Sequence, residues 1–342
     1  MRKKTTAGIL AVSLAAALAV GCGAKSESES SGTSSVSDSN SSSMATESSG
    51  ASSATADSGE NGDGVTAETQ YPLTITDDLG NSVTIESEPE RVVSLSPANT
   101  ETLFALGADE KIVGRTDYCS YPEEAADVAS VGTYTSPNTE LIISMEPDVI
   151  FASDYIDDSV RSQVENAGAS VIVFAANDME SVEQDILTAG QVLNLNKEAK
   201  EITDGMEAKM TELREILASN TEEKTAFIDL GDYYSAGEGS LLGNMLDDIG
   251  VRNVAADTGE MWPQLSVETI IESNPDVYIS FYSSPDELKA VSGLSELDCI
   301  QNDRIVYFES LSPDSDLVQR AGPRLAEGTW LLAEKIYPEL FS

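Results

Sequence analysis

The residue types that carry most protein chemistry are scarce in this sequence of 342 residues, which contains no histidine. A Ser-His-Asp triad, a Cys-His pair, an HExxH zinc site and an imidazole ligand for haem or cobalt all need that side chain. The three cysteines, Cys22, Cys119 and Cys299, are too few and too far apart for a disulfide framework or a four-cysteine metal site. Carboxylates are plentiful, so a hydrolase that uses two acids stays open, but no catalytic pair stands out. We therefore expect neither an enzyme nor a resident metal or cofactor.

The balance of charge restricts the partners. Sixty Asp and Glu residues stand against 19 Lys and Arg residues, and the formal net charge is −41. A surface this acidic repels phosphate backbones, so nucleic acid is not expected as a partner. Hydrophobic residues make up 40% of the chain and aromatic residues only 6%, so the places where aromatic side chains gather are informative.

The first 22 residues have the pattern of a secretory signal. Three basic residues, Arg2-Lys3-Lys4, precede an apolar run from Ala7 to Val20. The ending Ala19-Val20-Gly21-Cys22 resembles a bacterial lipobox, with Ala19 where leucine is usual, and implies cleavage before Cys22 and acylation of its sulfur. An ordinary signal or a membrane anchor are the alternatives, although the apolar run is short for a span. The prediction is a lipid anchor at the outer face of the bacterial cytoplasmic membrane, on the extracellular or periplasmic side.

Residues 23–70 have the composition of a disordered linker. They contain 16 serines, eight acidic residues, one lysine and almost no large apolar side chain. Such a segment cannot bury enough surface to offset the entropy cost of ordering. With a mean reach of about 40 Å for 48 residues, it would tether a folded domain near a membrane.

From Tyr71 onward, strand and helix patterns alternate, which predicts an α/β fold with mainly parallel sheets. Alternating apolar residues predict a β-hairpin between Tyr71 and Ile85, with its turn at 77–81. Short β-rich runs predict strands at 91–96, 111–115, 148–152, 170–174, 226–230, 277–281 and 305–308. Helical spacing of apolar residues predicts helices at 99–106, 181–193 and 196–219. The last of these is a long rod with one apolar stripe, and it joins the two sets of strands.

A local sequence occurs twice. Glu140 stands seven residues before Pro147-Asp148-Val149, and Glu268 stands seven residues before Pro275-Asp276-Val277. In each copy a short helix stopped by proline leads into a buried strand. The repetition predicts two pseudo-symmetric lobes with a cleft between them, where ligand sites are expected. The predicted divisions are a signal peptide at 1–22, a linker at 23–70, an amino-terminal lobe at 71–178, an interlobe helical segment at 179–223 and a carboxyl-terminal lobe at 224–342.

Three further motifs accompany the repeat: Glu90-Arg91-Val-Val-Ser-Leu-Ser-Pro-Ala-Asn-Thr-Glu101, Leu106-Gly107-Ala108 and Val113-Gly114. Together with the single long helix, they resemble class III substrate-binding proteins of bacterial ABC importers, in the branch that takes up cobalamin, siderophores and haem. The resemblance covers residues 71–342. It implies two α/β lobes joined by one interlobe helix, little hinge motion, a monomer, and a membrane permease with its ATPase as partners.

Four loops are most similar to those of cobalamin-binding proteins: Asp117–Pro122, Val131–Tyr134, Trp262–Ser266 and Ser315–Arg324. In that subfamily aromatic side chains on such loops lie on either side of the corrin, and flat rings bury a large flattened macrocycle at low entropy cost. The chain departs from the pattern at Leu317 and Ser153, positions that can be tryptophan. The resemblance implies ligand-binding roles for Tyr118, Tyr134 and Trp262, and it places Arg320 near the ligand. Further candidates lie in loops after predicted strands: Tyr155, Tyr233 and Tyr234.

The choice among ligands follows from what the chain lacks. Without histidine it cannot offer imidazole to cobalt, so cobalamin would bind with the ligands of its own metal in place. Haem remains an alternative through tyrosine. Ferric siderophores are often anionic and prefer basic pockets, whereas residues 71–342 hold 15 Lys and Arg residues against 52 acids. A surface adhesin, which would need no cleft, is a further alternative.

Glu140 and Glu268 have a second implied role. In the family that this chain resembles, the corresponding glutamates pair with arginines of the permease, and such charge complementarity sets the register of docking. The alternative is a glutamate that only stabilises the first turn of a short helix through the helix dipole. The same position in both copies favours docking.

Three other features predict structure rather than function. Cys119 and Cys299 fall in different predicted lobes, where a disulfide would pin the cleft, so both are expected to be free thiols. Trp330 lies on an apolar helical face and is expected in the core. The glycine-rich segment 237–243 lacks the lysine of a phosphate-binding loop and is expected to lead into a helix.

Overall fold

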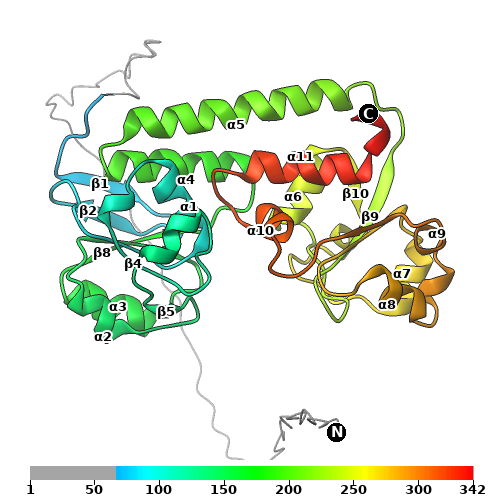
Figure 1. Cartoon of the computed structure of the whole chain (residues 1–342), viewed down its shortest axis with the longest axis horizontal. Helices are drawn as coiled ribbons and strands as arrows, with labels where there is room; N and C mark the ends of the chain where they lie inside the picture. Colours follow the sequence, from blue (N-terminus) through cyan, green and yellow to red (C-terminus); the bar gives the residue numbers. More distant parts are fainter. Residues whose placement is uncertain (1–66, 342) are drawn as a thin grey trace, which may run out of the picture. The chain divides into compact units, whose positions relative to one another are not determined.

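The computed structural model describes residues 67–341, whose framework is two four-stranded parallel sheets with helices packed on them (Figure 1). The predicted α/β architecture is confirmed. We call residues 73–174 (β1 to β8) lobe 1 and residues 224–319 (β9 to α10) lobe 2. The predicted signal peptide, Cys22 and residues 23–66 of the predicted linker lie outside the described residues.

Lobe 1 is organised around four parallel strands in the order β4-β3-β7-β8. The strands are β3 (Val92–Ser94), β4 (Ile112–Arg115), β7 (Val149–Ser153) and β8 (Ser170–Phe174), and the helices are α1 (Pro97–Ala105), α2 (Thr139–Ser144) and α3 (Asp158–Asn166). The central strands are continuous apolar runs because helices cover parallel sheets on both faces. The predicted hairpin is confirmed as β1 (Leu73–Thr76) and β2 (Ser82–Ile85), whereas the small hairpin of β5 (Gly132–Thr133) and β6 (Ser136–Pro137) was not predicted.

Lobe 2 repeats this topology with the order β10-β9-β11-β12, so β9 takes the place of β3 and β11 the place of β7. The strands are β9 (Lys224–Asp229), β10 (Val251–Asn253), β11 (Val277–Ser280) and β12 (Ile305–Tyr307). The helices are α6 (Leu241–Asp248), α7 (Val267–Ser273), α8 (Pro285–Ala290), α9 (Asp298–Gln301) and α10 (Pro313–Gln319). Strand β10 was not predicted, because its three residues include a single apolar one, Val251, and show no β pattern.

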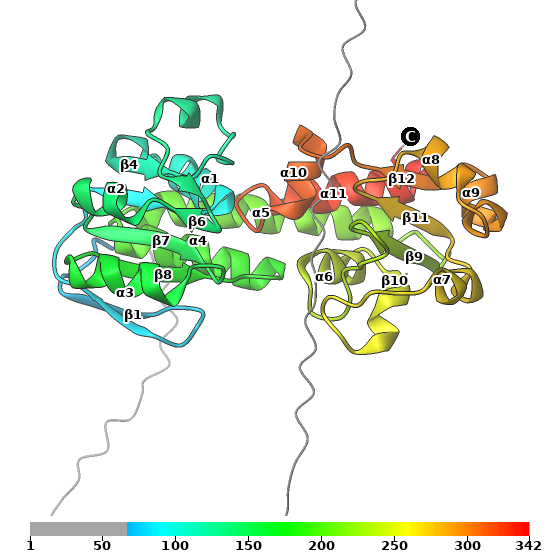
Figure 2. The same cartoon turned by 90° about the horizontal axis from the view of Figure 1, so that it is seen from below.

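A layer of long helices connects the lobes. Helix α4 (Met179–Val192) follows lobe 1, and α5 (Asn196–Leu217) leads into lobe 2. The 22 residues of α5 span about 33 Å at 1.5 Å per residue, which confirms the predicted long helix. Its buried stripe packs on α4 and on α11 (Leu325–Ile336), which lie one after the other along α5 in Figure 1, and Figure 2 gives the view from below. One buried apolar cluster includes residues of α5, α11 and both sheets, so the helix layer belongs to the core.

The repeated sequence forms the same structure in both lobes. Helices α2 and α7 each end at a residue with positive φ, Glu146 at 49° and Asn274 at 39°, and a proline follows at once. Proline cannot continue a helix, and its predecessor is pushed out of the right-handed helical region. The predicted unit of a short helix stopped before a strand is therefore confirmed in both copies.

The aspartate of each repeat binds the start of the neighbouring central strand, which is β3 in lobe 1 and β9 in lobe 2. The Asp148 carboxylate accepts hydrogen bonds from the backbone N–H groups of Glu90 and Arg91, both at 2.9 Å, at the start of β3. The Asp276 carboxylate accepts from the backbone N–H and the hydroxyl of Thr225, both at 2.9 Å, at the start of β9. Each aspartate thus fixes where the neighbouring parallel strand begins. The spacing of the repeat in the sequence did not predict this role.

Three smaller expectations are also confirmed. Cys119 and Cys299 are buried free thiols in different lobes. Trp330 packs against the main core cluster from α11. Segment 237–243 leads into α6, where the Ser240 hydroxyl accepts from the backbone N–H of Gly243 as an N-terminal cap.

A buried acid connects the β1–β2 hairpin with the helix layer. Asp185 of α4 is buried, and Asp78 lies beside it in the turn of the hairpin. Burial, and then the neighbouring Asp78 carboxylate, raise the pKa of Asp185 to about 8. The folded protein therefore holds a proton at neutral pH that the unfolded chain, with an aspartate pKa of about 3.9, has lost.

We expect this group to make the protein less stable as the pH rises from about 4 to about 8, because the folded state binds the extra proton. Asp185→Asn should flatten that decline and raise the free energy of unfolding at pH 8 by about 1–3 kcal/mol. Urea unfolding at pH 5 and pH 8 measures the difference. The exposed Asp109→Asn serves as the control and should leave the pH dependence unchanged. An unaltered pH dependence in Asp185→Asn would contradict the assignment.

Candidate ligand-binding site

The carboxyl ends of the strands in the two sheets face each other. Ser120, in the loop that follows β4, donates from its hydroxyl to the Asp316 carboxylate of α10 at 3.4 Å. Asn244 of α6 donates from its side chain to the carbonyl of Asn177, which follows β8, at 2.8 Å. Helices α6 and α10 come after β9 and β12, so both contacts join the carboxyl-end loops of one sheet to those of the other. Open parallel sheets bind their ligands at this edge.

Three of the predicted ligand residues form one cluster on lobe 1. The ring centroids of Tyr118 and Tyr134 are 5.9 Å apart, and those of Tyr134 and Tyr155 are 6.0 Å apart, both in edge-to-face contact. Their exposed fractions are 47%, 39% and 64%. Burial raises the pKa of the Tyr155 hydroxyl, which therefore stays protonated at neutral pH. We call these residues the tyrosine cluster, and it presents a contiguous aromatic surface.

Local contacts explain why separate loops bring these tyrosines together. The Thr100 hydroxyl of α1 donates to the buried Cys119 sulfur at 3.0 Å, which anchors the loop after β4. The backbone N–H of Asp117 donates to the carbonyl of Gly132 at 2.9 Å, which ties that loop to the β5–β6 hairpin. Tyr134 lies at the tip of this hairpin. Thr100 and Cys119 are buried beneath the loop, whereas the neighbouring ring of Tyr118 is exposed.

Two loop segments of lobe 2, 233–237 and 261–265, pair with each other and form what we call the lobe 2 rim. The backbone N–H of Ser235 donates to the carbonyl of Pro263 at 2.8 Å, and flanking backbone hydrogen bonds continue the pairing on both sides. Trp262 and Tyr234 are 51% and 50% exposed on this rim. Tyr233 is half-buried, because its ring packs against the smaller core cluster of lobe 2. The rim and the tyrosine cluster share no ring contact in the described part of the chain.

Arg320, the remaining predicted ligand residue, is held by other side chains. Its guanidinium donates to the buried Glu101 carboxylate of α1 at 2.7 Å and to Asp316 at 2.5 Å. It also donates to the Ser120 hydroxyl at 3.0 Å and to the Tyr118 carbonyl at 3.4 Å. Arg320 thus bridges the lobes and touches the loop that carries Tyr118, while its charge is balanced by two carboxylates.

Arg324 completes this interlobe contact. It belongs, with Arg320, to residues 320–324 between α10 and α11, which we call the connector. Its guanidinium donates to both oxygens of Glu101, at 2.8 and 2.9 Å, in a bidentate pair. The guanidinium also lies 3.6 Å from the ring centroid of Tyr121, and this cation–π contact fixes one face of that ring. Sequence reasoning missed Glu101 and Tyr121 as parts of the site.

The two predicted docking residues occupy equivalent positions. Glu140 lies in the first turn of α2, capped by Asn138, and Glu268 lies in the first turn of α7, capped by Ser266. Both glutamates are exposed. The arrangement suits either helix stabilisation or a contact with a partner, since each carboxylate is free to reach into solvent.

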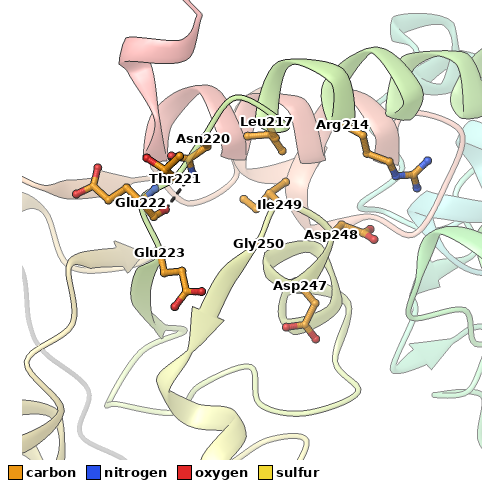
Figure 3. Close-up of a pocket in the computed structure, with 10 residues that line it drawn as sticks. All are labelled: Arg214, Leu217, Asn220, Thr221, Glu222, Glu223, Asp247, Asp248, Ile249 and Gly250. Atoms are coloured by element: carbon orange, nitrogen blue, oxygen red, sulfur yellow. Dashed lines mark hydrogen bonds between the residues drawn. The ribbon is translucent and has the colours of Figure 1, made fainter.

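Two cavities lie away from the predicted ligand residues. The larger, of about 540 Å³, is at the carboxyl end of α5 beside α6 and β10, and Figure 3 shows acidic side chains on its wall together with Arg214. Burial raises the pKa of its Asp247 and Asp248 side chains. The smaller, of about 290 Å³, lies between α2 and α3. Neither contains a residue of the tyrosine cluster or the lobe 2 rim.

The described residues also bear on metals and membranes. Between residues 67 and 341, no group of three or more Cys, Asp and Glu side chains is arranged to hold a metal ion. None of the helices in the same range is long and apolar enough to cross a bilayer.

Comparisons with known proteins agree with this architecture. A family model described as periplasmic binding protein matches residues 92–310. An uncharacterized ABC transporter substrate-binding lipoprotein, YvrC of Bacillus subtilis, is 35% identical over 285 residues, which span 79% of this chain and 87% of that protein. A protein of Halobacterium salinarum named cobalamin-binding protein is 27% identical over 266 residues, 75% of this chain and 72% of that one.

A solved structure supports the same assignment. A possible iron-binding (periplasmic solute-binding) protein from Staphylococcus epidermidis superimposes with a TM-score of 0.66 at 26% identity. The superposition covers 73% of this chain and 100% of that protein's chain. The family match runs from the start of β3 to just beyond β12 and includes α4 and α5. The chain therefore belongs to the periplasmic binding protein family with the class III fold, and it is a substrate-binding protein of an ABC importer rather than an enzyme.

Proposed function

We propose that this protein captures cobalamin or a related corrinoid in a cleft between its lobes and delivers it to a membrane permease driven by an ATPase. The observation that supports this most is the pair of exposed aromatic surfaces on facing edges. The tyrosine cluster lies on lobe 1, and Trp262 and Tyr234 lie on the lobe 2 rim. A corrin is a broad, flattened macrocycle, and two aromatic walls would cover its faces or edges.

Charge and metal chemistry support the same ligand class. Arg320 and Arg324 are the cations of the interlobe contact, and Glu101 and Asp316 balance them. Little free positive charge is left there for an anionic ligand. A corrinoid that keeps its own cobalt ligands needs no histidine, and the chain has none. The name of the Halobacterium salinarum relative agrees with this choice.

A ferric siderophore or haem is the second candidate. The similar Staphylococcus epidermidis structure carries an iron-binding description, and a tyrosine can ligate haem iron. The tyrosine cluster would supply that ligand. A neutral ferric hydroxamate would also bind without needing a free cation in the site. A hydrolase or an adhesin has no support from the family to which the chain belongs.

We also propose that residues 1–22 are a lipoprotein signal, that Cys22 carries the lipid, and that residues 23–70 tether the lobes to the outer face of the membrane. The sequence pattern of residues 2–22 and the word lipoprotein in the name of the Bacillus subtilis relative support this. The proposed division of the folded part is an amino-terminal lobe at 71–178, an interlobe segment at 179–223 and a carboxyl-terminal lobe at 224–342. Glu140 and Glu268 would dock one lobe each on the permease.

Calorimetric titration with cyanocobalamin, haem and a ferric hydroxamate tests the ligand. We expect tight one-to-one binding of cyanocobalamin and no heat from the other two, because only the corrinoid matches both aromatic walls without needing a protein metal ligand. Heat from haem or the hydroxamate alone would replace the corrinoid with the second candidate. Silence with all three would reject the proposed ligand class.

Trp262→Ala should weaken cyanocobalamin binding by about 10- to 100-fold, about 1.4–2.7 kcal/mol, because it removes an exposed ring from the lobe 2 rim. The same titration measures the change. Leu79→Ala is a matched control, since Leu79 is equally exposed but lies in the turn of the β1–β2 hairpin. Equal affinities for the wild type and Trp262→Ala would remove the tryptophan from the site.

Replacing both Glu140 and Glu268 with lysine should abolish uptake of the ligand by cells while its affinity for the purified protein stays unchanged. Reversed charges would repel the permease arginines that the docking model requires. Uptake of radiolabelled cyanocobalamin measures the effect. A control that reverses Glu212 and Glu215, exposed on α5, should transport normally. Normal uptake by the Glu140 and Glu268 double variant would show that docking uses other residues.

A further inference from the structure

Lobe 2 exposes a further tyrosine outside its rim. Tyr282 comes directly after β11 and is 64% exposed, as exposed as Tyr155 of the tyrosine cluster. In the described part of the chain its hydroxyl has no hydrogen-bond partner. A ring this exposed contributes little to the core, so its environment is set by the neighbouring backbone.

The backbone of Gly231, after β9, holds the Tyr282 ring in place. A Cβ atom on residue 231 would lie 3.2 Å from Cδ2 of the ring and 3.5 Å from both Cε2 and Cγ. Three ring atoms at similar distances mean that a face of the ring lies against this backbone. Gly231 also has a φ of +112°, a conformation that favours glycine. One ring face is therefore fixed, and the opposite face is open.

Tyr282 is joined through Gly231 to the lobe 2 rim. The Gly231 carbonyl accepts from the backbone N–H of Tyr234 at 3.0 Å. The Gln264 side chain donates to the carbonyl of Asp232 at 3.0 Å, and Gln264 pairs with Tyr234 in an isolated β-bridge. Tyr282, Tyr234 and Trp262 thus stand on one hydrogen-bonded set of loops at the edge that faces lobe 1.

The topology gives Tyr282 a counterpart. Strand β11 of lobe 2 takes the place that β7 has in lobe 1, and Tyr155 lies in the loop after β7. Each lobe therefore carries an exposed tyrosine in the loop that follows the corresponding central strand. The two loops belong to the sheet edges that face each other.

We propose that Tyr282 is a further ligand-contacting residue, whose open face packs against a broad, flat and largely uncharged ring system. This rests on the proposed function, because it takes the interlobe region as the ligand site. The glycine at position 231 preorganises the ring, so the contact forms without ordering a free side chain. The hydroxyl is available to a polar group at the edge of the ligand, such as an amide.

Titration of the full chain with cyanocobalamin, haem and a ferric hydroxamate tests this with the variants Tyr282→Ala and Tyr282→Phe. For whichever probe the wild type binds, we expect Tyr282→Ala to lose about 10-fold in affinity. We expect Tyr282→Phe to lose less than threefold, because it keeps the ring face. Ile271→Ala, exposed on α7, is the control and should bind like the wild type. Thermal unfolding should be unchanged in all three variants, since Tyr282 is exposed.

The outcomes separate this inference from the proposed function. Wild-type affinity in Tyr282→Ala, together with weakened binding in Trp262→Ala, would reject Tyr282 and leave the corrinoid site standing. Binding of haem or the hydroxamate alone, with a loss in Tyr282→Ala, would reject the corrinoid and keep the Tyr282 contact. Absence of binding of all three probes to the wild type would reject both.

Discussion

The relative position of the lobes depends on one buried carboxylate. Glu101 lies in α1 and receives hydrogen bonds from both arginines of the connector, Arg320 and Arg324. A buried carboxylate is tolerated only when cations and hydrogen-bond donors surround it, and removing one partner leaves an uncompensated charge. Because the connector follows lobe 2 and α1 belongs to lobe 1, this pairing fixes the lobes against each other. The same Arg320 donates to the Ser120 hydroxyl, so a residue of the connector positions the loop that bears Tyr118.

The ion cluster also determines what kind of surface lies between the lobes. Glu101 and Asp316 supply two negative charges, and Arg320 and Arg324 supply two positive charges. The cluster is therefore neutral in a chain whose formal net charge is −41. At the facing edges, exposed aromatic rings stand beside exposed acids such as Asp117, Asp154 and Asp232. Under the proposed function, recognition relies on shape and on stacking, which suits a wide ligand with a polar rim.

The sequence predicted the parts of this structure that depend on local pattern. Strands, the long helix α5 and the repeated Pro-Asp unit were found because periodicity and proline positions act over a few residues. It predicted neither β10, which has a single apolar residue, nor the pairing of Glu101 with Arg324, which joins residues far apart in the chain. The tyrosine cluster was anticipated through a family resemblance. Tyr282 carried the same signal as Tyr155, an aromatic residue after a strand, but its packing on Gly231 is visible only in three dimensions.

The helix layer has a thermodynamic consequence. Helix α5 packs along both α4 and α11, and the connector and the Asn244–Asn177 contact hold the lobes at two further points. The relative orientation of the lobes is thus decided when the chain folds, before a ligand arrives. Capture then costs little conformational entropy, and affinity reflects contacts rather than closure. Under the proposed function, rapid release then requires that the lobes be moved apart from outside this chain, at the surface where it meets its transporter.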